Sequence, residues 1–413
     1  MLNWVNRFNI FCFLDNCDYR FTEPAFDCLV ATGSKRATTD KPRKAFQNLD
    51  EFLDANKGEW IFGHLGYDLK NENGSTQSEL VDGIGFDDLF FFIPEIILQL
   101  GMDHLTIYAD TDAEIIFRSI LECPGTIQHQ TVSPVQVNQR IPRDEYIGII
   151  NKLREHILRG DCYEINFCQE FYAEDAVIDP LYTYWRLTER SPNPFSAFYR
   201  INNKYCFSAS PERYLAKSGE RIYSQPIKGT SKRNLVDAEK DEANKQYLLQ
   251  SNKEKSENVM VVDLVRNDLS RVCVAGTVQV DELFGLYSFP QLHQMISTVS
   301  GILKPGIPVS ELFRSSFPMG SMTGAPKIRV MQLIEQYEQT RRGLFSGAIG
   351  YFKPVPDAGH DFDFNVVIRS MMYNASSQYL SFQTGSGITF YSDPENEYEE
   401  CLLKATAMLE ILK

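Results

Sequence analysis

Hydrophobic side chains recur at helical spacing in three stretches of the chain. After Asp144 they fall three or four residues apart as far as Ile157, and Gly160 follows as a stop signal. The same spacing follows Pro326, a residue suited to the first turn of a helix. A last helix is predicted from about Glu395 to Leu412.

A two-residue alternation between positions 361 and 369 predicts a strand. Apolar residues occupy the even positions from Phe362 to Ile368, so Arg369 is expected to point away from the aromatic row. A neighbouring strand is predicted to end in a turn at 385–387, where glycines would let backbone amides approach a ligand. Strands mixed with amphipathic helices, without a regular strand–helix–strand rhythm, indicate an α+β architecture.

The chain is long enough to bury a large core, with 413 residues of which 43% are hydrophobic. A Pro- and Gly-containing polar stretch from Pro124 to Pro142 predicts a connection between an N-terminal part, 1–125, and a second part, 140–413.

Charge, cysteines and hydropathy exclude several classes of protein. A formal net charge of -14 argues against nucleic acid or an anionic membrane as the main partner. Nine cysteines without zinc-site spacing predict reduced thiols, and therefore a cytoplasmic protein. The longest apolar stretch, Leu89 to Leu100, is interrupted and too short for a membrane helix. The N-terminus lacks the pattern of a signal peptide.

Lys228 is the residue that points most directly to chemistry. It lies beside the Gly229 and Thr230 turn, sixteen positions after Glu212. An amine paired with a carboxylic acid that can shuttle a proton suits covalent catalysis.

Five blocks in fixed order carry a resemblance to the chorismate-utilising enzymes: 225–230 (QPIKGT), 257–271, 317–329, 347–352 and 385–404. Within that family the chain most resembles the large aminating subunits, aminodeoxychorismate synthase component I. The likeness is strong from about 140 to the end and weaker before. It implies two β-sheets packed as a sandwich with helices outside and the active site between them. The second part would then be the chorismate-binding catalytic region.

The resemblance also implies a Mg²⁺ site. Glu257 and Glu400 match the two glutamates that hold the ion in the family, and Glu254 and Glu397 could support them through water. Considered alone, the acidic string at 397–400 is more typical of a solvated helix face with a Glu400–Lys404 pair.

Further residues match the family's substrate contacts. Arg369, Tyr351, Lys404 and Gly387 correspond to groups on the pyruvyl side of chorismate, whereas Gly229 and Thr230 correspond to the turn at the ring carboxylate. Gly385 belongs to the glycine turn. Ser321 either lines the same pocket or caps the following helix. His293 corresponds to a histidine against the C4 hydroxyl, although a lone histidine is more often structural.

The implied reaction is amination of chorismate at C4 to 4-amino-4-deoxychorismate, in 4-aminobenzoate and folate biosynthesis. Lys228, with its pKa lowered by burial or cationic neighbours, would attack C2 while Glu212 protonates the departing C4 hydroxyl. Ammonia from a separate glutamine amidotransferase subunit would then expel the lysine. The alternatives are anthranilate synthase component I, which usually has alanine in place of Lys228, and a non-catalytic homologue that binds the glutaminase or chorismate.

The chain departs from the family pattern at several places. Glu164 stands where aminating members commonly have glutamine and where water-adding members have a lysine. His293 lies one residue before the usual histidine position, which Gln294 occupies. Near the N-terminus, Phe13 to Asn16 is a diverged form of an effector-loop motif, so the first 125 residues could contribute an effector or partner site. Trp60 to Leu69 resembles an N-terminal strand of the family and indicates one folded unit.

Overall fold

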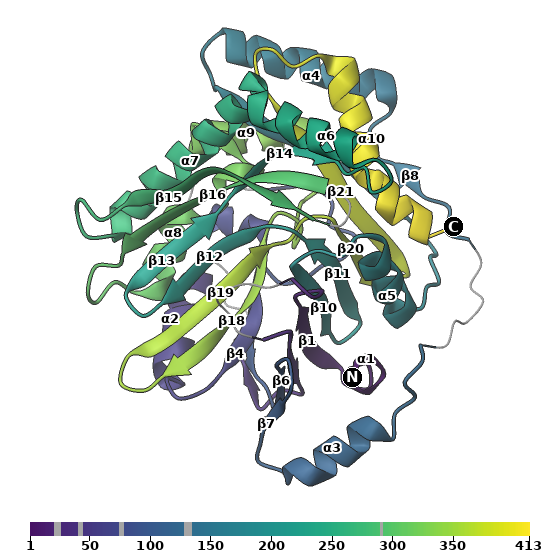
Figure 1. Cartoon of the computed structure of the whole chain (residues 1–413), viewed down its shortest axis with the longest axis vertical. Coiled ribbons are helices and arrows are strands. Elements are labelled where there is room, and N and C mark those ends of the chain that lie inside the picture. Colours follow the sequence, from purple (N-terminus) through teal and green to yellow (C-terminus); the bar gives the residue numbers. More distant parts are fainter. Residues whose placement is uncertain (20–25, 40–43, 74–77, 128–133, 290–291) are drawn as a thin grey trace.

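The protein is described by a computed structural model that covers residues 1–19, 26–39, 44–73, 78–127, 134–289 and 292–413. Two large antiparallel sheets form its centre and helices lie outside them (Figure 1). This arrangement is the α+β sandwich that the resemblance implied.

The first sheet holds eleven strands within the described residues. Their spatial order is β17 (Gly324–Ala325), β9 (Glu164–Ala173), β21 (Tyr379–Ile388), β20 (Ser370–Asn374), β11 (Lys204–Ser210), β10 (Phe195–Ile201), β1 (Ile10–Asp15), β2 (Cys28–Thr32), β6 (Ile96–Leu100) and β7 (Leu105–Ala109), with β8 (Asn138–Gln139) paired to β9.

The second sheet holds ten strands in the same described part. Their order is β14 (Ile227–Lys232), β16 (Leu292–Ile302), β13 (Arg221–Gln225), β12 (Arg213–Ser218), β19 (Gly359–Val366), β18 (Ala348–Val355), β4 (Ile61–Leu65), β5 (Leu89–Ile93) and β3 (Arg36–Ala37), with β15 (Gln279–Ser288) paired to β16.

Each sheet has its own set of helices. The first sheet is accompanied by α1 (Leu2–Val5), α3 (Ala113–Leu121), α4 (Arg143–Leu158), α5 (Pro180–Arg190), α9 (Lys327–Tyr337) and α10 (Pro394–Ile411). The second is accompanied by α2 (Ala45–Ala55), α6 (Ala238–Gln250), α7 (Asn252–Val272) and α8 (Val309–Ser316). Two short 3₁₀ helices, η1 (Tyr67–Asn73) and η2 (Gly320–Met322), lie in connections.

One hydrophobic core joins the two sheets. Ala31 and Tyr199 of the first sheet and Phe62 and Ile349 of the second belong to a single buried cluster. N-terminal strands enter both sheets, because β1 pairs with β10 and β4 pairs with β18. The N-terminal residues are therefore built into the same sandwich as the rest of the chain.

The three predicted helices are confirmed as α4, α9 and α10. The apolar residues of α4 that recur at helical spacing face the core, namely Tyr146, Ile149, Ile150 and Leu153. Pro326 precedes α9 as its N-cap instead of lying in its first turn. Asp393 caps α10 by accepting a hydrogen bond from the Asn396 backbone amide.

Two strand predictions were wrong in their ends. The strand from 361 stops at Val366, because the chain then leaves the second sheet and enters β20 of the first. Arg369 lies in this crossing with a left-handed backbone, φ 49°, so the alternation did not fix its direction. Residues 385–387 form no turn, since β21 runs through them and pairs with β9 as far as Ile388.

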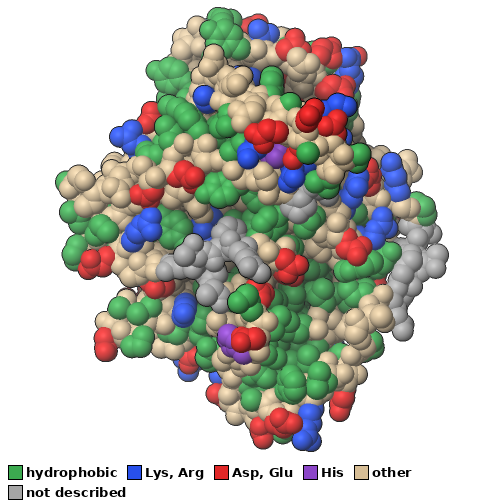
Figure 2. All heavy atoms as spheres, in the orientation of Figure 1, with side chains coloured by type: hydrophobic (Ala, Val, Ile, Leu, Met, Phe, Trp, Pro, Cys, Tyr) green, Lys and Arg blue, Asp and Glu red, His purple; other side chains and the backbone are tan. Residues whose placement is uncertain are grey.

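The surface mixes charges of both signs. On the face drawn in Figure 2, Lys and Arg side chains lie interspersed with Asp and Glu. The nine cysteines are all free thiols. Among the described helices, none combines the length and the apolar character needed to cross a membrane.

Candidate active site

The site forms where the chain crosses twice between the sheets. Glu212 lies in the connection from β11 to β12, and Arg369 lies in the connection from β19 to β20. The crossings run side by side, because the Val366 amide donates to the Glu212 carbonyl (3.0 Å) and the Ala209 amide donates to the Arg369 carbonyl (3.2 Å). Two segments about 155 residues apart thus bring an acid and a cation together.

Glu212 is a buried acid with one strong partner. Its side chain accepts a hydrogen bond of 2.7 Å from the Ser321 hydroxyl in η2. Burial raises the pKa of Glu212 to about 7, although Ser321, Lys228 and Arg369 act in the opposite direction. A carboxyl with this pKa can hold and release a proton at neutral pH. Ser321 therefore serves Glu212 and does not cap α9.

Arg369 is a partly buried cation that forms no salt bridge with any described acid. Burial lowers the pKa of Arg369 to about 10, and Glu212 partly offsets this effect. A buried guanidinium is costly unless an anion joins it. Arg369 is thus suited to a carboxylate of a bound substrate.

Lys228 bridges the two sheets. Its Nζ on β14 lies 2.6 Å from Oε1 of Glu164 on β9, and both side chains are largely buried. Burial acts to lower the pKa of Lys228, but the carboxylates of Glu164, Glu257 and Glu400 outweigh it, so the pKa is raised. The expectation of a lowered pKa was wrong, because the neighbours are mainly anionic.

Glycines make room for this ion pair. A Cβ on Gly387 would lie 2.8 Å from both Lys228 Nζ and Glu164 Oε1, and one on Gly385 would meet the Phe167 carbonyl oxygen at 1.9 Å. Gly229 has φ +93° and packs against Glu254. Thr230, the next residue, is exposed.

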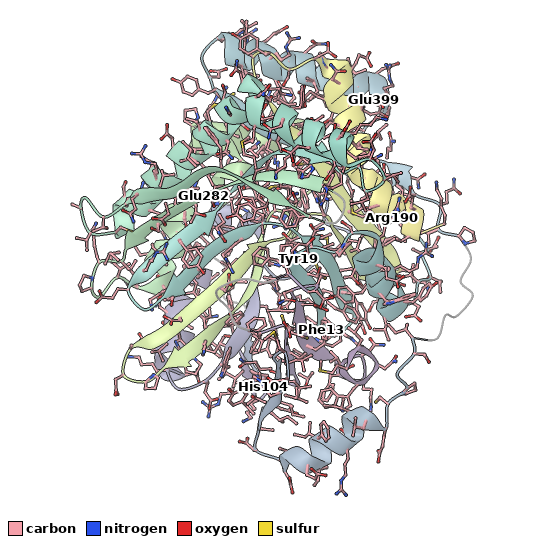
Figure 3. All side chains as sticks on the ribbon, viewed as in Figure 1. Phe13, Tyr19, His104, Arg190, Glu282 and Glu399 are labelled. Carbon is pink, nitrogen blue, oxygen red and sulfur yellow. The ribbon has the colours of Figure 1, made fainter. Side chains whose placement is uncertain are left out.

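Acidic side chains from α7 and α10 complete the site. Lys253 lies 3.9 Å from Glu257 and 3.8 Å from Glu397, so it links the two helices. Glu400 pairs with Lys404 at 2.7 Å, and Lys404 also donates to the Gly385 carbonyl. Glu399, labelled on α10 in Figure 3, is exposed, whereas Glu397 is buried.

Two carboxylate oxygens of these acids are available to bind a cation, since no described group donates to them. Oε1 of Glu257 and Oε2 of Glu397 are buried and accept no hydrogen bond from any described group. Burial raises the pKa of Glu257 to about 7, with Glu164 and Glu254 adding to the effect, and burial also raises the pKa of Glu254. Burial acts against ionisation of Glu400 as well, but Lys404 and Lys253 hold its pKa below the usual value.

The set fits Mg²⁺ if substrate oxygens share the coordination. In the described part of the chain, no three acidic, histidine or cysteine side chains converge enough to hold a metal by themselves. Mg²⁺ commonly takes one or two protein carboxylates together with water and substrate oxygens. Glu257 and Glu400 can supply such ligands, with Glu254 and Glu397 behind them.

Two predicted residues, His293 and Tyr351, have described partners other than Glu212 and Lys228. His293 is held by the Ser288 hydroxyl (2.8 Å) and Asp241 (3.2 Å). Its described hydrogen bonds therefore join it to β15 and α6, and none of them is to Glu212 or Lys228. Strand alternation places the neighbouring Gln294 on the opposite face of β16, where its Oε1 is buried without a hydrogen-bond partner among the described groups.

Tyr351 packs in an aromatic cluster with Phe26, Trp60 and Phe62. It lines a separate, open pocket together with Asp15 and residues of several other segments. The described contacts of Tyr351 are therefore those of a packed aromatic side chain.

Sequence reasoning missed two partners in the site. The contact between Glu164 and Lys228 spans 64 positions, and only the unusual glutamate hinted at it. Lys253 could have been noticed from its helical spacing of four residues before Glu257.

The chain is similar to known proteins over most of its length. Residues 10–410 match the family model for chorismate binding enzymes. The chain is 33% identical over 398 residues to an anthranilate synthase component I-like protein of Synechocystis sp., covering 92% of this chain and 80% of the relative. It is 36% identical over 271 residues to aminodeoxychorismate synthase component 1 of Escherichia coli, covering 66% of this chain and 58% of that protein.

A solved structure is similar over almost the whole chain. Anthranilate synthase component I from Streptococcus pneumoniae superposes with a TM-score of 0.80 at 26% identity, covering 95% of this chain and 94% of that one. The fold, the site and the family match lead to one conclusion: the chain belongs to the chorismate-binding enzymes and is a chorismate-utilising enzyme.

Proposed function

We propose that the protein aminates chorismate at C4 to give 4-amino-4-deoxychorismate through a covalent adduct of Lys228. The observation that carries this proposal is the placement of an amine, Lys228, within one buried group that also contains the acid Glu212. The likeness to aminodeoxychorismate synthase component 1 supports the same reaction.

The two residues divide the first displacement between them. Nζ of Lys228 forms a bond to C2, the ring double bonds shift, and the C–O bond at C4 breaks. Glu212, with its pKa near 7, donates the proton with which the hydroxyl leaves as water. Ammonia then attacks C4, the double bonds shift back, and the lysine departs from C2.

Cations in the site hold the dianionic substrate. Arg369, unpaired with the described acids, is suited to the pyruvyl carboxylate as a bidentate donor. Glu257 and Glu400 would hold Mg²⁺, which, when bound, would polarise the ring carboxylate. Lys404 keeps Glu400 ionised for that purpose.

Ammonia is proposed to come from a glutamine amidotransferase on a separate subunit. The "component 1" name of the bacterial relative implies a second component of that enzyme. The product would feed 4-aminobenzoate and folate biosynthesis, in the cytoplasm.

The direct test supplies purified protein with chorismate, Mg²⁺ and ¹⁵N-ammonium and identifies products by mass. A non-aromatic product that carries ¹⁵N, without pyruvate, is expected, and chelation of the metal is expected to abolish it. Quenching during turnover should leave substrate-derived mass on the peptide that contains Lys228. Anthranilate with pyruvate would contradict the proposal.

Anthranilate synthase remains the second candidate because of two observations. The Synechocystis relative and the solved Streptococcus structure both carry that name. In that reaction, however, Lys228 would have no covalent role, so the Lys228→Ala variant would keep much of its activity.

A further inference from the structure

Glu164 makes the shortest polar contact to the nucleophile. Its Oε1 lies 2.6 Å from Nζ of Lys228, and Glu164 is only 3% exposed. The two residues come from facing sheets, so the tertiary fold places them together. A charged hydrogen bond of this length is one along which a proton can move.

Lys228 cannot attack carbon as an ammonium, because a proton occupies the lone pair of its nitrogen. Burial acts to lower the pKa of Lys228, but the surrounding carboxylates raise it, so the resting side chain carries its proton. An acceptor must take that proton before the C–N bond forms.

Of the described acids that face Lys228, one is in contact with its Nζ. Glu164 comes from β9, Glu212 from the crossing to β12, Glu257 from α7 and Glu400 from α10. The nearby cations are Arg369, Lys253 and Lys404. Among the described residues, Glu164 alone is hydrogen-bonded to Nζ.

Apart from Lys228, no described side chain donates to the Glu164 carboxylate. Its second oxygen, Oε2, is buried and accepts no hydrogen bond within the described structure. Gly387 leaves space beside the pair that any side chain would fill. The carboxylate therefore has one oxygen and an adjacent space that no other described donor occupies.

We propose that Glu164 is the catalytic base that takes the proton from Lys228, a role that rests on the lysine-adduct mechanism proposed above. The N–H bond breaks and an O–H bond forms on Oε1. Nζ then attacks C2 with the freed electron pair, while water leaves C4 with the proton of Glu212. When ammonia displaces the lysine, Nζ leaves with its electron pair and takes its proton back from Glu164.

The ion pair and the neutral pair contain the same number of protons. The lysine can thus be activated without losing a proton to solvent, and the wild-type rate does not depend on hydroxide for this step. A glutamine at position 164 keeps the shape but cannot accept the proton.

The test compares Glu164→Gln with wild type in pH profiles of kcat/KM for ammonium-dependent product formation. We expect a loss of about 100-fold at pH 7, the scale of general-base catalysis. We also expect the ratio of the variant's kcat/KM to the wild-type value to rise with pH, because solvent must now deprotonate the lysine, whereas the loss of the Glu212 proton affects both enzymes alike. Glu164→Asp should recover part of the rate.

Glu174→Gln, at an exposed position just after β9, is the matched control and should behave as wild type. Thermal unfolding and chorismate binding check that each variant is folded. A folded Glu164→Gln enzyme with the wild-type rate and profile, or with an equal loss at every pH, would overturn the inference. Failure of the wild type to form the aminated product would instead count against the proposed function.

Discussion

The sandwich holds two contrasting regions between or beside its sheets. Around Lys228 the side chains are charged, and several of their polar atoms have no partner among the described groups. Around Tyr351 the side chains are aromatic and pack ring against ring. Both regions lie in segments that match the family pattern, so a motif match alone did not separate a reactive position from a packed one.

The difference teaches that a group of buried polar atoms without hydrogen-bond partners indicates where a substrate or metal would bind. Burying a polar group without a partner is costly, and stable proteins rarely retain such groups for structure alone. Glu164, Glu257 and Glu397 each keep a buried carboxylate oxygen without a hydrogen-bond partner among the described groups. A bound metal and ammonia would supply the missing partners.

Lys228→Ala is expected to have the largest effect on activity, and it tests whether the region around Lys228 is reactive. If this region is reactive through an adduct, kcat should fall by about 10³-fold or more, because the nucleophile is gone. The substrate-derived mass should also vanish from the peptide. Lys232→Ala, exposed on the same strand, should leave activity unchanged. Substantial product from Lys228→Ala would mean that the lysine is not covalent.

Glu212→Gln tests the acid of the same region. The pKa of Glu212 is raised to about 7, so the acid is protonated below that pH and loses its proton above it. Wild-type activity should therefore decline as the pH rises above about 7. The variant should be about 100-fold slower and lack that decline, as stopped-time product assays across pH would show. Glu220→Gln, exposed between β12 and β13, is its control.

Arg369→Gln should affect binding more than chemistry. Loss of a charged hydrogen bond to a carboxylate corresponds to an increase in KM for chorismate of about 10- to 100-fold. Steady-state kinetics would separate this effect from a fall in kcat. An unchanged KM would argue that the substrate carboxylate binds elsewhere. Arg266→Gln, on the exposed face of α7, is the matched control.

Tyr351→Phe has the smallest expected effect. The ring contacts remain and only the hydroxyl is lost, so kcat/KM should stay within about two-fold of wild type. A large rise in KM would mean that the Tyr351 hydroxyl contacts the substrate and that the two regions do not differ in function.

Local patterns predicted the helices but not the crossings. The spacing of Tyr146, Ile149 and Ile150 is enough to define α4, because helix periodicity depends on near neighbours. Alternation failed after Val366, since the chain changes sheets there and Arg369 takes a left-handed backbone. A short-range sequence pattern does not show which sheet the chain enters after it leaves a strand.

The residues of the site also differ in whether sequence patterns could place them. Glu257 and Glu400 lie on regular helices, so their place could be inferred from blocks of sequence. The pair of Glu164 and Lys228 depends on how β9 and β14 face each other, which spacing does not reveal. Its anionic surroundings also reversed the expected direction of the pKa of Lys228.

The same pair has a mechanical meaning. Because β14 and β9 belong to different sheets, the ion pair of Lys228 and Glu164 links the two sheets at the edge strand β14. Under the proposed mechanism, moving the proton would turn this ion pair into a neutral hydrogen-bonded pair, and forming the adduct would break it. Each turnover would then loosen and refasten the sandwich at the place where the substrate is held.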